Sequence, residues 1–177
     1  HSSTVLSILK EVKASGVNFV VYNTETRPKF QGRKTAEELA KQGIKVHHFV
    51  DSAIKQAIKQ ADIVLIGCDA ILSTGEVVNK VGTNLITEIA DKYDVPVYIC
   101  TDSWKFDPFT IKGYEEPIEK RPAKEVWDKK IKNVIIHNPA FDIMEPDHIT
   151  GVISELGIYP PLVFVEEIKR EYPWMFN

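Results

Sequence analysis

Three polar side chains with complementary chemistry lie close together in the sequence, at Asp69, Asn79 and Lys80. The aspartate follows Gly67 and an apolar run at residues 63–66, so it lies where a buried strand should be ending. A carboxylate there is costly unless it is solvated, paired or used in chemistry, and open α/β sheets bind ligands at this edge. An acid at a strand end, followed by an amide and a cation ahead of a helix, predicts a site for a phosphorylated substrate.

Other polar residues follow other predicted strands. Arg27 and Gln31 lie in a polar, Pro-containing loop, and Lys105 follows a strand predicted at residues 96–100. Segments of this kind at one edge of a sheet would converge on a single crevice. The alternative is that loops are polar anyway, and that Arg27 forms a simple ion pair with Glu25.

The elements that must position these residues alternate along the chain. Apolar spacing predicts helices at residues 2–13, 36–42, 52–60, 83–93 and 160–172, and strands at residues 18–22, 45–50, 63–66, 96–100, 134–136 and 149–153. Thr35 and Glu38 would form a capping box at the second helix. Strands that alternate with helices through short connections predict an α/β, Rossmann-like fold, with a mainly parallel sheet and helices on both faces.

Residues 101–132 interrupt this regularity. Their prolines and mixed charges indicate a loop excursion with a short strand near residues 114–118, and the charged run at 115–132 is interpreted as a solvated face. Residues 138–142 are predicted to form a loop. Without an internal repeat or a linker, residues 1–177 are predicted to form a single domain.

Composition narrows the class of protein. The 177 residues, 44% of them hydrophobic, are sufficient for one domain with a full core. A net charge of −3 gives no electrostatic case for direct nucleic-acid binding. No apolar run approaches the roughly 18 residues of a membrane span, and two cysteines are too few for a secreted disulfide framework. We therefore expect a cytoplasmic protein with no membrane partner.

Cofactor chemistry finds little support in the sequence. Cys68 and Cys100 are interpreted as small buried residues rather than nucleophiles, because no His and Asp/Asn set accompanies them. His47 and His48 alternate along a strand, so at most one faces any site, and we expect no metal and no cofactor. The tryptophans are interpreted as core or interface anchors: Trp104, Trp127 and Trp174.

Several segments together resemble a known family. They are TETRPKFQG (24–32), GCDAI followed by NKVGT (67–83), WKF (104–106), and NPAFD with ITGVISELGIYPP (138–161). In this order they are similar to the C-terminal domain of the family that contains the regulatory subunits of translation initiation factor 2B, methylthioribose-1-phosphate isomerase and archaeal ribose-1,5-bisphosphate isomerase. The residues of these motifs are most similar to those of the archaeal isomerase branch.

The resemblance implies a catalytic pair of a cysteine and an aspartate in the isomerases. The aspartate matches Asp69, whereas the cysteine of a Cys-His-Ser type motif would directly precede His1. Cys68 lies in the aspartate motif and does not replace it. Because the chain begins without Met on a predicted helix, we expect it to be the C-terminal part of a longer protein whose N-terminal helical domain is absent. The 177-residue chain alone is then expected to be inactive.

The resemblance also implies roles for the site residues. Asp69 would be the acid–base group of an aldose–ketose isomerase, kept partly protonated by burial at its strand end. Asn79, Lys80 and Lys105 would hold substrate hydroxyl and phosphate oxygens. Further substrate contacts would come from the helix start and from the first motif: His1, Ser2, Ser3, Arg27 and Gln31.

Two alternatives to a ribose 1,5-bisphosphate isomerase remain open. One is a non-catalytic regulatory subunit in translation initiation, which would bind partner proteins and a nucleotide or sugar phosphate. The retained Asp69, Asn79 and Lys80 favour an enzyme. The other is a methylthioribose-1-phosphate isomerase, although Lys105 suits a second phosphate.

The C-terminal segment predicts self-association. Leu162, Val165 and Ile168 would form the buried stripe of the closing helix, which leaves Phe164 and the tail aromatics Trp174 and Phe176 without cover. Such aromatic residues are typical of interface cores. We expect a homo-oligomer, a dimer through this domain with a hexamer as an option for the complete protein. The alternative is that the tail folds back over its own sheet.

Overall fold

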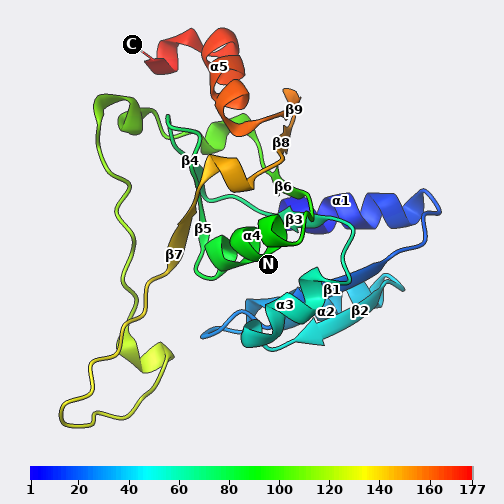
Figure 1. The fold of residues 1–177 in the computed structure, drawn as a ribbon, viewed down its shortest axis with the longest axis vertical. Helices are drawn as coiled ribbons and strands as arrows, with labels where there is room; N and C mark the ends of the chain where they lie inside the picture. The colour runs from blue at the N-terminus through cyan, green and yellow to red at the C-terminus, as the bar shows by residue number, and fades with distance from the viewer. Residues whose placement is uncertain (177) are drawn as a thin grey trace.

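A computed structural model of the chain describes residues 1–176 and shows an α/β fold whose strands divide among three sheets (Figure 1). The first is the parallel pair β1 (Val20–Thr24) and β2 (Lys45–Phe49). The second is parallel except at its last strand and has the order β3 (Val64–Ile66), β6 (Val97–Cys100), β8 (Gly151–Ser154) and β9 (Gly157–Tyr159). The third is antiparallel and has the order β4 (Ala70–Ile71), β5 (Val77–Lys80) and β7 (Phe141–Met144).

The α/β class is confirmed, but one continuous and mainly parallel sheet is not what the described strands form. Among residues 1–176, the parallel pairs of strands are β1–β2, β3–β6 and β6–β8, and one isolated parallel bridge joins Ile71 to Phe106. The hairpin of β4 and β5 was missed because each strand is short and the connection carries Ser73, Thr74 and Gly75, which read as loop. Antiparallel partners such as β7 are chosen by distant backbone, which a local pattern does not reveal.

Five α-helices of the described chain flank these sheets. They are α1 (Ser3–Ala14), α2 (Gln31–Lys41), α3 (Ile54–Ile58), α4 (Thr83–Lys92) and α5 (Pro161–Glu171). Short 3-10 turns occur at η1 (Asp51–Ala53), η2 (Ser103–Lys105), η3 (Pro108–Lys112), η4 (Ala123–Glu125), η5 (Pro146–His148) and η6 (Pro173–Phe176). Among residues 1–176, no helix is long and apolar enough to cross a membrane.

Helix α2 begins earlier than the sequence predicts. Its N-cap is Phe30, with φ of 56° and no side-chain cap, so the predicted capping box of Thr35 and Glu38 is wrong. Thr35 instead lies inside the helix, and its hydroxyl contacts the ring Nδ1 of His1 at 3.1 Å. The early start is set by the tight turn that precedes α2, not by a capping residue.

The region after β6 also differs from the prediction. Residues 113–140, here called the arm, extend away from the body of the protein (Figure 1). Val134 and Ile135 lie on this arm and are 46% and 81% exposed, so the predicted buried strand at 134–136 is wrong. The predicted strand near 114–118 is also absent from the described arm. The strand of this region is β7, which begins inside the segment predicted as loop.

The hydrophobic core has two parts. The main cluster joins the inner faces of the second and third sheets to α5, through residues such as Ile71, Val77, Ile99, Val152 and Phe164. A smaller cluster of Leu6, Leu39 and Ile44 joins α1, α2 and the start of β2. Two different parts of the core therefore hold in place the segments that carry the candidate site residues.

The C-terminal helix buries a different stripe from the predicted one. Phe164, Val165 and Ile168 are buried, whereas Leu162 is 57% exposed. Phe176 stacks on Phe106 with ring centroids 5.0 Å apart, so part of the tail does fold back on its own chain. The assignment of Phe164 to an interface is therefore wrong, whereas Phe176 is only partly covered by its own chain and its interface role stays a prediction.

Gly32 offers a direct test of how the first motif is packed. A Cβ at this position would lie 1.7 Å from the carbonyl oxygen of Thr24, closer than any non-bonded contact allows. Replacing Gly by Ala inside a helix normally stabilises it by about 1 kcal/mol. We expect Gly32→Ala to lower the free energy of unfolding instead, by about 1–3 kcal/mol, measured by urea denaturation.

Gly16→Ala is the control, because nothing lies within 4 Å of its added Cβ and only its φ of 87° is unfavourable. A Gly32→Ala chain as stable as the parent, with Gly16→Ala the more damaging change, would contradict the packing described here.

Candidate functional site

Asp69 lies directly before β4 and beside the start of α1. Its backbone N–H donates to the carbonyl oxygen of Val78 on β5 at 2.9 Å. Ser2, the N-cap of α1, packs on Gly67, where an added Cβ would lie 2.8 Å from the Ser2 Cβ and Oγ. Burial lowers the pKa of the His1 α-ammonium, and the nearby charge of Asp69 opposes this shift. The structure thus brings the helix start and Asp69 together.

The side chain of Asp69 is exposed, which corrects the expectation that the strand end would bury it. The strand β3 ends at Ile66, and Gly67 and Cys68 carry the chain out of the sheet before the aspartate is reached. Ser3 is likewise exposed, as the first residue of α1. The described residues therefore form an open surface around Asp69 rather than an enclosed cavity.

Lys105 reaches the same surface from the end of β6. It is the last residue of η2, and its charge, like that of Asp69, acts on the thiol of Cys68. The turn is fixed by Glu155, whose carboxylate accepts hydrogen bonds from the backbone N–H of Ser103 (3.0 Å) and from its hydroxyl. Ser103 is fully buried. An exposed lysine is thus carried on a firmly anchored turn.

Asn79 and Lys80 are the last two residues of β5, not part of a loop before a helix. Asn79 pairs with Asp142 and Lys80 with Phe141 on β7. Because successive side chains of a strand alternate, these two residues point to opposite faces of the sheet. They lie close to Asp69 through the β4–β5 pairing, but they cannot contact one small group from the same side.

The loop that carries Arg27 is held by Asp51. The Asp51 carboxylate accepts the backbone N–H groups of Thr26 and Arg27, both at 2.7 Å. The Arg27 guanidinium donates to the carbonyl oxygen of Val126 on the arm at 3.1 Å. Arg27 therefore links the loop to the arm, a contact across 99 positions of sequence.

The alternative of an ion pair between Arg27 and Glu25 is wrong. Glu25 pairs with Arg33 instead, with Nη2 and Oε2 2.8 Å apart. Gln31 is the exposed first residue of α2, and it lies on the same turn as Arg27.

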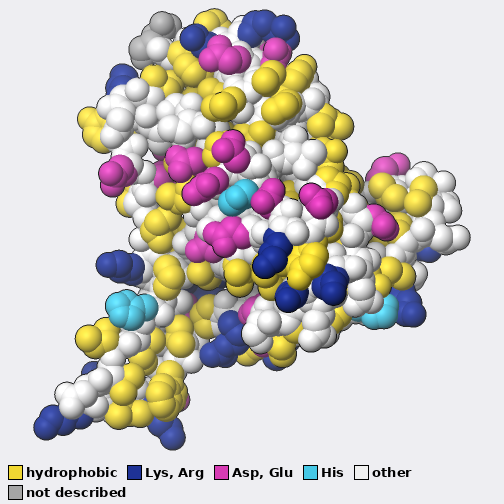
Figure 2. Space-filling view, in the orientation of Figure 1, with side chains coloured by type: hydrophobic (Ala, Val, Ile, Leu, Met, Phe, Trp, Pro, Cys, Tyr) yellow, Lys and Arg dark blue, Asp and Glu magenta, His cyan; other side chains and the backbone are white. Residues whose placement is uncertain are grey.

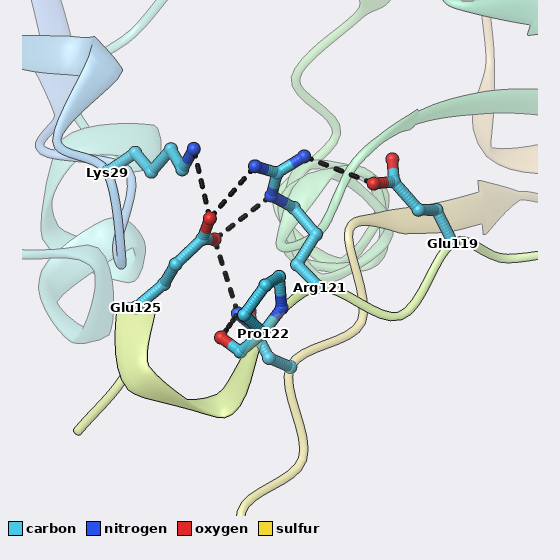
Figure 3. Close-up of polar contacts among 6 residues, drawn as sticks. Lys29, Glu119, Arg121, Pro122 and Glu125 are labelled. Carbon is cyan, nitrogen blue, oxygen red and sulfur yellow. Dashed lines mark hydrogen bonds and ion pairs between the residues drawn. The ribbon is translucent and has the colours of Figure 1, made fainter. Parts of the chain in front are cut away.

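Sequence reasoning missed an ionic network between this loop and the arm, which Figure 3 shows. The Glu125 carboxylate contacts Lys29 Nζ at 3.0 Å and the Arg121 Nη2 and Nε atoms at 2.8 and 3.0 Å. Arg121 Nη1 also contacts Glu119 at 3.1 Å. Asn138 donates to the carbonyl of Pro122 at 3.0 Å. The interpretation of this charged run as only a solvated face is therefore incomplete. The spacing of Arg121 and Glu125, four positions apart, was the available signal.

The rest of the arm is open to solvent. Lysine and apolar side chains gather toward its far end in the space-filling view (Figure 2), and Trp127 and Ile131 are 46% and 45% exposed. Trp104 and Trp174, at the other end of the molecule, are 66% and 60% exposed. The interpretation of the tryptophans as core anchors is therefore wrong, and an interface role is left as a prediction.

Two hollows of the described surface lie away from Asp69. One of about 280 Å³ is lined by residues of α4 and η5, among them Asp91, Asp94 and His148. Another of about 350 Å³ lies on the arm beside Trp127 and Lys130. Neither is lined by the candidate substrate-binding residues.

Comparison with known proteins shows the family of the chain. The chain belongs to the initiation factor 2 subunit family, whose model matches residues 1–161. It is similar to a ribose 1,5-bisphosphate isomerase from Pyrococcus furiosus, with 39% identity over 182 residues that cover 100% of this chain and 56% of the relative. It is also 37% identical to a methylthioribose-1-phosphate isomerase from Fervidobacterium nodosum, covering 94% of this chain and 50% of that protein.

A solved structure shows the same fold. The translation initiation factor eIF-2B of Pyrococcus horikoshii OT3 superposes with a TM-score of 0.84 and 32% identity, covering 93% of this chain and 57% of that one. The chain spans about half the length of these relatives. The family resemblance inferred from the sequence motifs is confirmed.

Cys68 provides a test of the environment around Asp69. Burial is the main cause that raises the pKa of its thiol to about 12, so the reactive thiolate is scarce at pH 8. Unfolding should return this pKa to about 8.5. We expect Cys68 in a Cys100→Ser chain to react with Ellman's reagent at pH 8 about 10³-fold more slowly when folded than in urea. Equal rates in the two states would mean that Cys68 is not buried as described.

Proposed function

We propose that this chain is the C-terminal, substrate-binding part of a sugar-phosphate aldose–ketose isomerase that converts ribose 1,5-bisphosphate to ribulose 1,5-bisphosphate. The observation that carries the proposal is an exposed carboxylate, Asp69, beside the N-terminus of α1, on a segment that lies between the segments of Lys105 and Lys80. Lys105 lies on η2, and its charge acts on the thiol of Cys68 as that of Asp69 does. Lys80 lies on β5, the strand that pairs with β4. An acid–base group flanked by two cations suits a sugar that carries two phosphates.

The proposed reaction moves hydrogen within the sugar and neither adds nor removes any. The ring oxygen of the sugar gains a proton as the ring opens, and the C2 hydroxyl loses one as the ketone forms. The hydrogen on C2 moves to C1. Asp69 is proposed to give and take these protons, since general acid–base catalysis typically contributes about 10²–10⁴-fold to the rate. The catalytic partner of Asp69 is proposed to be a cysteine supplied directly before His1.

The phosphates are proposed to bind on either side of Asp69. Lys105 and the backbone N–H groups at the start of α1, near Ser2 and Ser3, face one phosphate, because a helix N-terminus favours an anion. Lys80 and Gln31 are proposed to hold the other, with Arg27 steadying the loop that leads to Gln31 at the start of α2. Asn79, on the opposite face of β5 from Lys80, is proposed to hold a substrate hydroxyl instead of sharing that phosphate.

We further propose that an N-terminal helical domain covers Asp69 in the complete polypeptide. The exposure of Asp69 in this chain supports this view, because acid–base groups work best where water is excluded. The Rossmann-like arrangement of the parallel strands β1–β2 and β3–β6–β8 is part of the same proposal. The site residues themselves need no metal or cofactor for this chemistry.

A second candidate function is a non-catalytic subunit in translation initiation, as suggested by the similarity to an initiation factor structure. A methylthioribose-1-phosphate isomerase is the third, and it would need only one phosphate site. The two assays that separate these functions are turnover of ribose 1,5-bisphosphate and turnover of methylthioribose 1-phosphate by the complete polypeptide.

The first test replaces the proposed acid–base group. In the complete polypeptide, Asp69→Asn should lower turnover of ribose 1,5-bisphosphate by about 10²–10⁴-fold while substrate affinity changes little, since the amide keeps the shape but not the proton. The 177-residue chain should be inactive. Asp62→Asn, another exposed aspartate just before β3, is the matched control. Full activity of Asp69→Asn would remove this residue from the chemistry.

The second test concerns the proposed homodimer. Trp104, Tyr172 and Trp174 form one aromatic cluster with centroids 5.3 Å apart, and both tryptophans remain exposed. Aromatic residues of this kind anchor interfaces. The 177-residue chain should sediment as a dimer at micromolar concentration, and Trp174→Ser should shift it to a monomer. Trp127→Ser on the arm should leave it dimeric, whereas a folded parent chain that sediments as a monomer contradicts the proposal.

A further inference from the structure

Four charged groups meet where the arm contacts the loop before α2 (Figure 3). Glu125 bridges Lys29 and Arg121, and only 16% of its side chain is exposed. The hydrogen bond from Arg121 is the main cause that holds the pKa of Glu125 down to about 2, so this carboxylate stays ionised at every physiological pH. The protein therefore keeps a permanent anion between two cations at this place.

A third cation lies next to this anion without a carboxylate of its own. Backbone pairing joins the segments in order: Lys80 pairs with Phe141, Ala140 donates to the carbonyl of Glu119, and Arg121 donates to the carbonyl of Asn138. Lys80 thus lies one extended segment away from Arg121. It is half-buried, and among residues 1–176 no ion-pair partner lies within 4.0 Å of it.

The charges that surround Lys80 leave it short of negative charge. Burial is the main cause that lowers its pKa, and the positive charges of Arg121 and Lys29 lower it further, more than Glu125 and Glu119 restore. A half-buried cation among other cations is stabilised by an added anion. The cluster has three cations, Lys29, Lys80 and Arg121, and one of its two carboxylates is held in common by two of them.

We propose that Lys29, Lys80 and Arg121 form a binding site for a phosphate dianion, and that Glu125 is an internal competitor which occupies part of it. When a phosphate binds to Lys80, it draws Lys29 and one face of the Arg121 guanidinium away from Glu125. A guanidinium suits this exchange because its fork binds a carboxylate or a phosphate in the same geometry. Binding is thereby coupled to release of the arm from the loop.

This inference rests on the proposed phosphate-binding role of Lys80, but not on isomerase chemistry. It adds Lys29 and Arg121 as residues that determine affinity for the phosphate, and it gives the arm a defined function. If the ion pairs of Glu125 with Lys29 and Arg121 only stabilise the fold, removing the Glu125 carboxylate should not raise the affinity of the chain for phosphate. The two explanations therefore predict opposite results for a change at Glu125.

The test measures the affinity of the 177-residue chain for inorganic phosphate by isothermal titration calorimetry at constant ionic strength. Glu125→Gln keeps the shape of the side chain and removes its charge, so the affinity for phosphate should rise on the order of tenfold. Arg121→Gln should weaken binding by a similar factor. An unchanged or lower affinity in a folded Glu125→Gln chain, with folding checked by circular dichroism, overturns the proposal.

Glu119→Gln is the matched control, because this glutamate also contacts Arg121 but is 52% exposed and does not touch Lys29. Its affinity for phosphate should change by less than about twofold, since an exposed charge is screened by solvent. A gain equal to that of Glu125→Gln would show an effect of net charge alone and overturns the site. Adding Lys29→Gln to Glu125→Gln should cancel the gain, and persistence of the gain also overturns it.

The proposed function and this inference fail separately. If the complete polypeptide turns over neither sugar phosphate, while phosphate affinity follows the pattern above, the proposed isomerase activity is contradicted and the phosphate site is supported. If the polypeptide is an active isomerase but Glu125→Gln leaves its phosphate affinity unchanged, the proposed activity is supported and the role of Glu125 as a competitor is overturned.

Discussion

The antiparallel pairing of β5 with β4 on one side and β7 on the other is the constraint on which the candidate site depends. It places Asp69 beside Asn79 and Lys80, and it brings the segment that contains Arg121 alongside them. The pairing also divides Asn79 from Lys80, because adjacent residues of a strand point to opposite faces. One short strand thus supplies groups to two sides of the same sheet.

Close packing of backbone accounts for the rest of the arrangement. Gly67 has no side chain because Ser2 occupies that space, and Gly32 has none because the end of β1 does. These two contacts join α1 to the segment before β4 and α2 to the loop after β1. Any larger residue would push the start of a helix away from the site, so the geometry around Asp69 is set by steric exclusion as much as by attraction.

We propose that the charges of the site suit an anion. The segments of Lys105 and Lys80 lie on either side of the segment of Asp69, and Glu125, which contacts Lys29 and Arg121, belongs to the arm and not to the sheet. Exposed ion pairs contribute little to stability individually. We propose that the network at the joint between the loop and the arm acts in binding a phosphate and releasing the arm, rather than in stabilising the fold. The proposal thereby gives the arm a role in phosphate binding.

The sequence by itself determined the α/β class, most helices, the parallel strands and the family, because periodic apolar runs and contiguous motifs are local properties of the chain. It also named Asp69 and Lys105 after predicted strands and Lys80 ahead of a predicted helix as candidate site residues, since such positions are visible without coordinates. It could not show that Asp69 is exposed, that Asn79 and Lys80 diverge, or that Glu125 bridges Lys29 and Arg121. Those facts depend on pairings between segments that are distant in the sequence, such as β5 with β7 and Lys29 with Glu125. Strand partners and ion pairs over such separations are chosen by packing of the whole chain, so only the tertiary structure decided them.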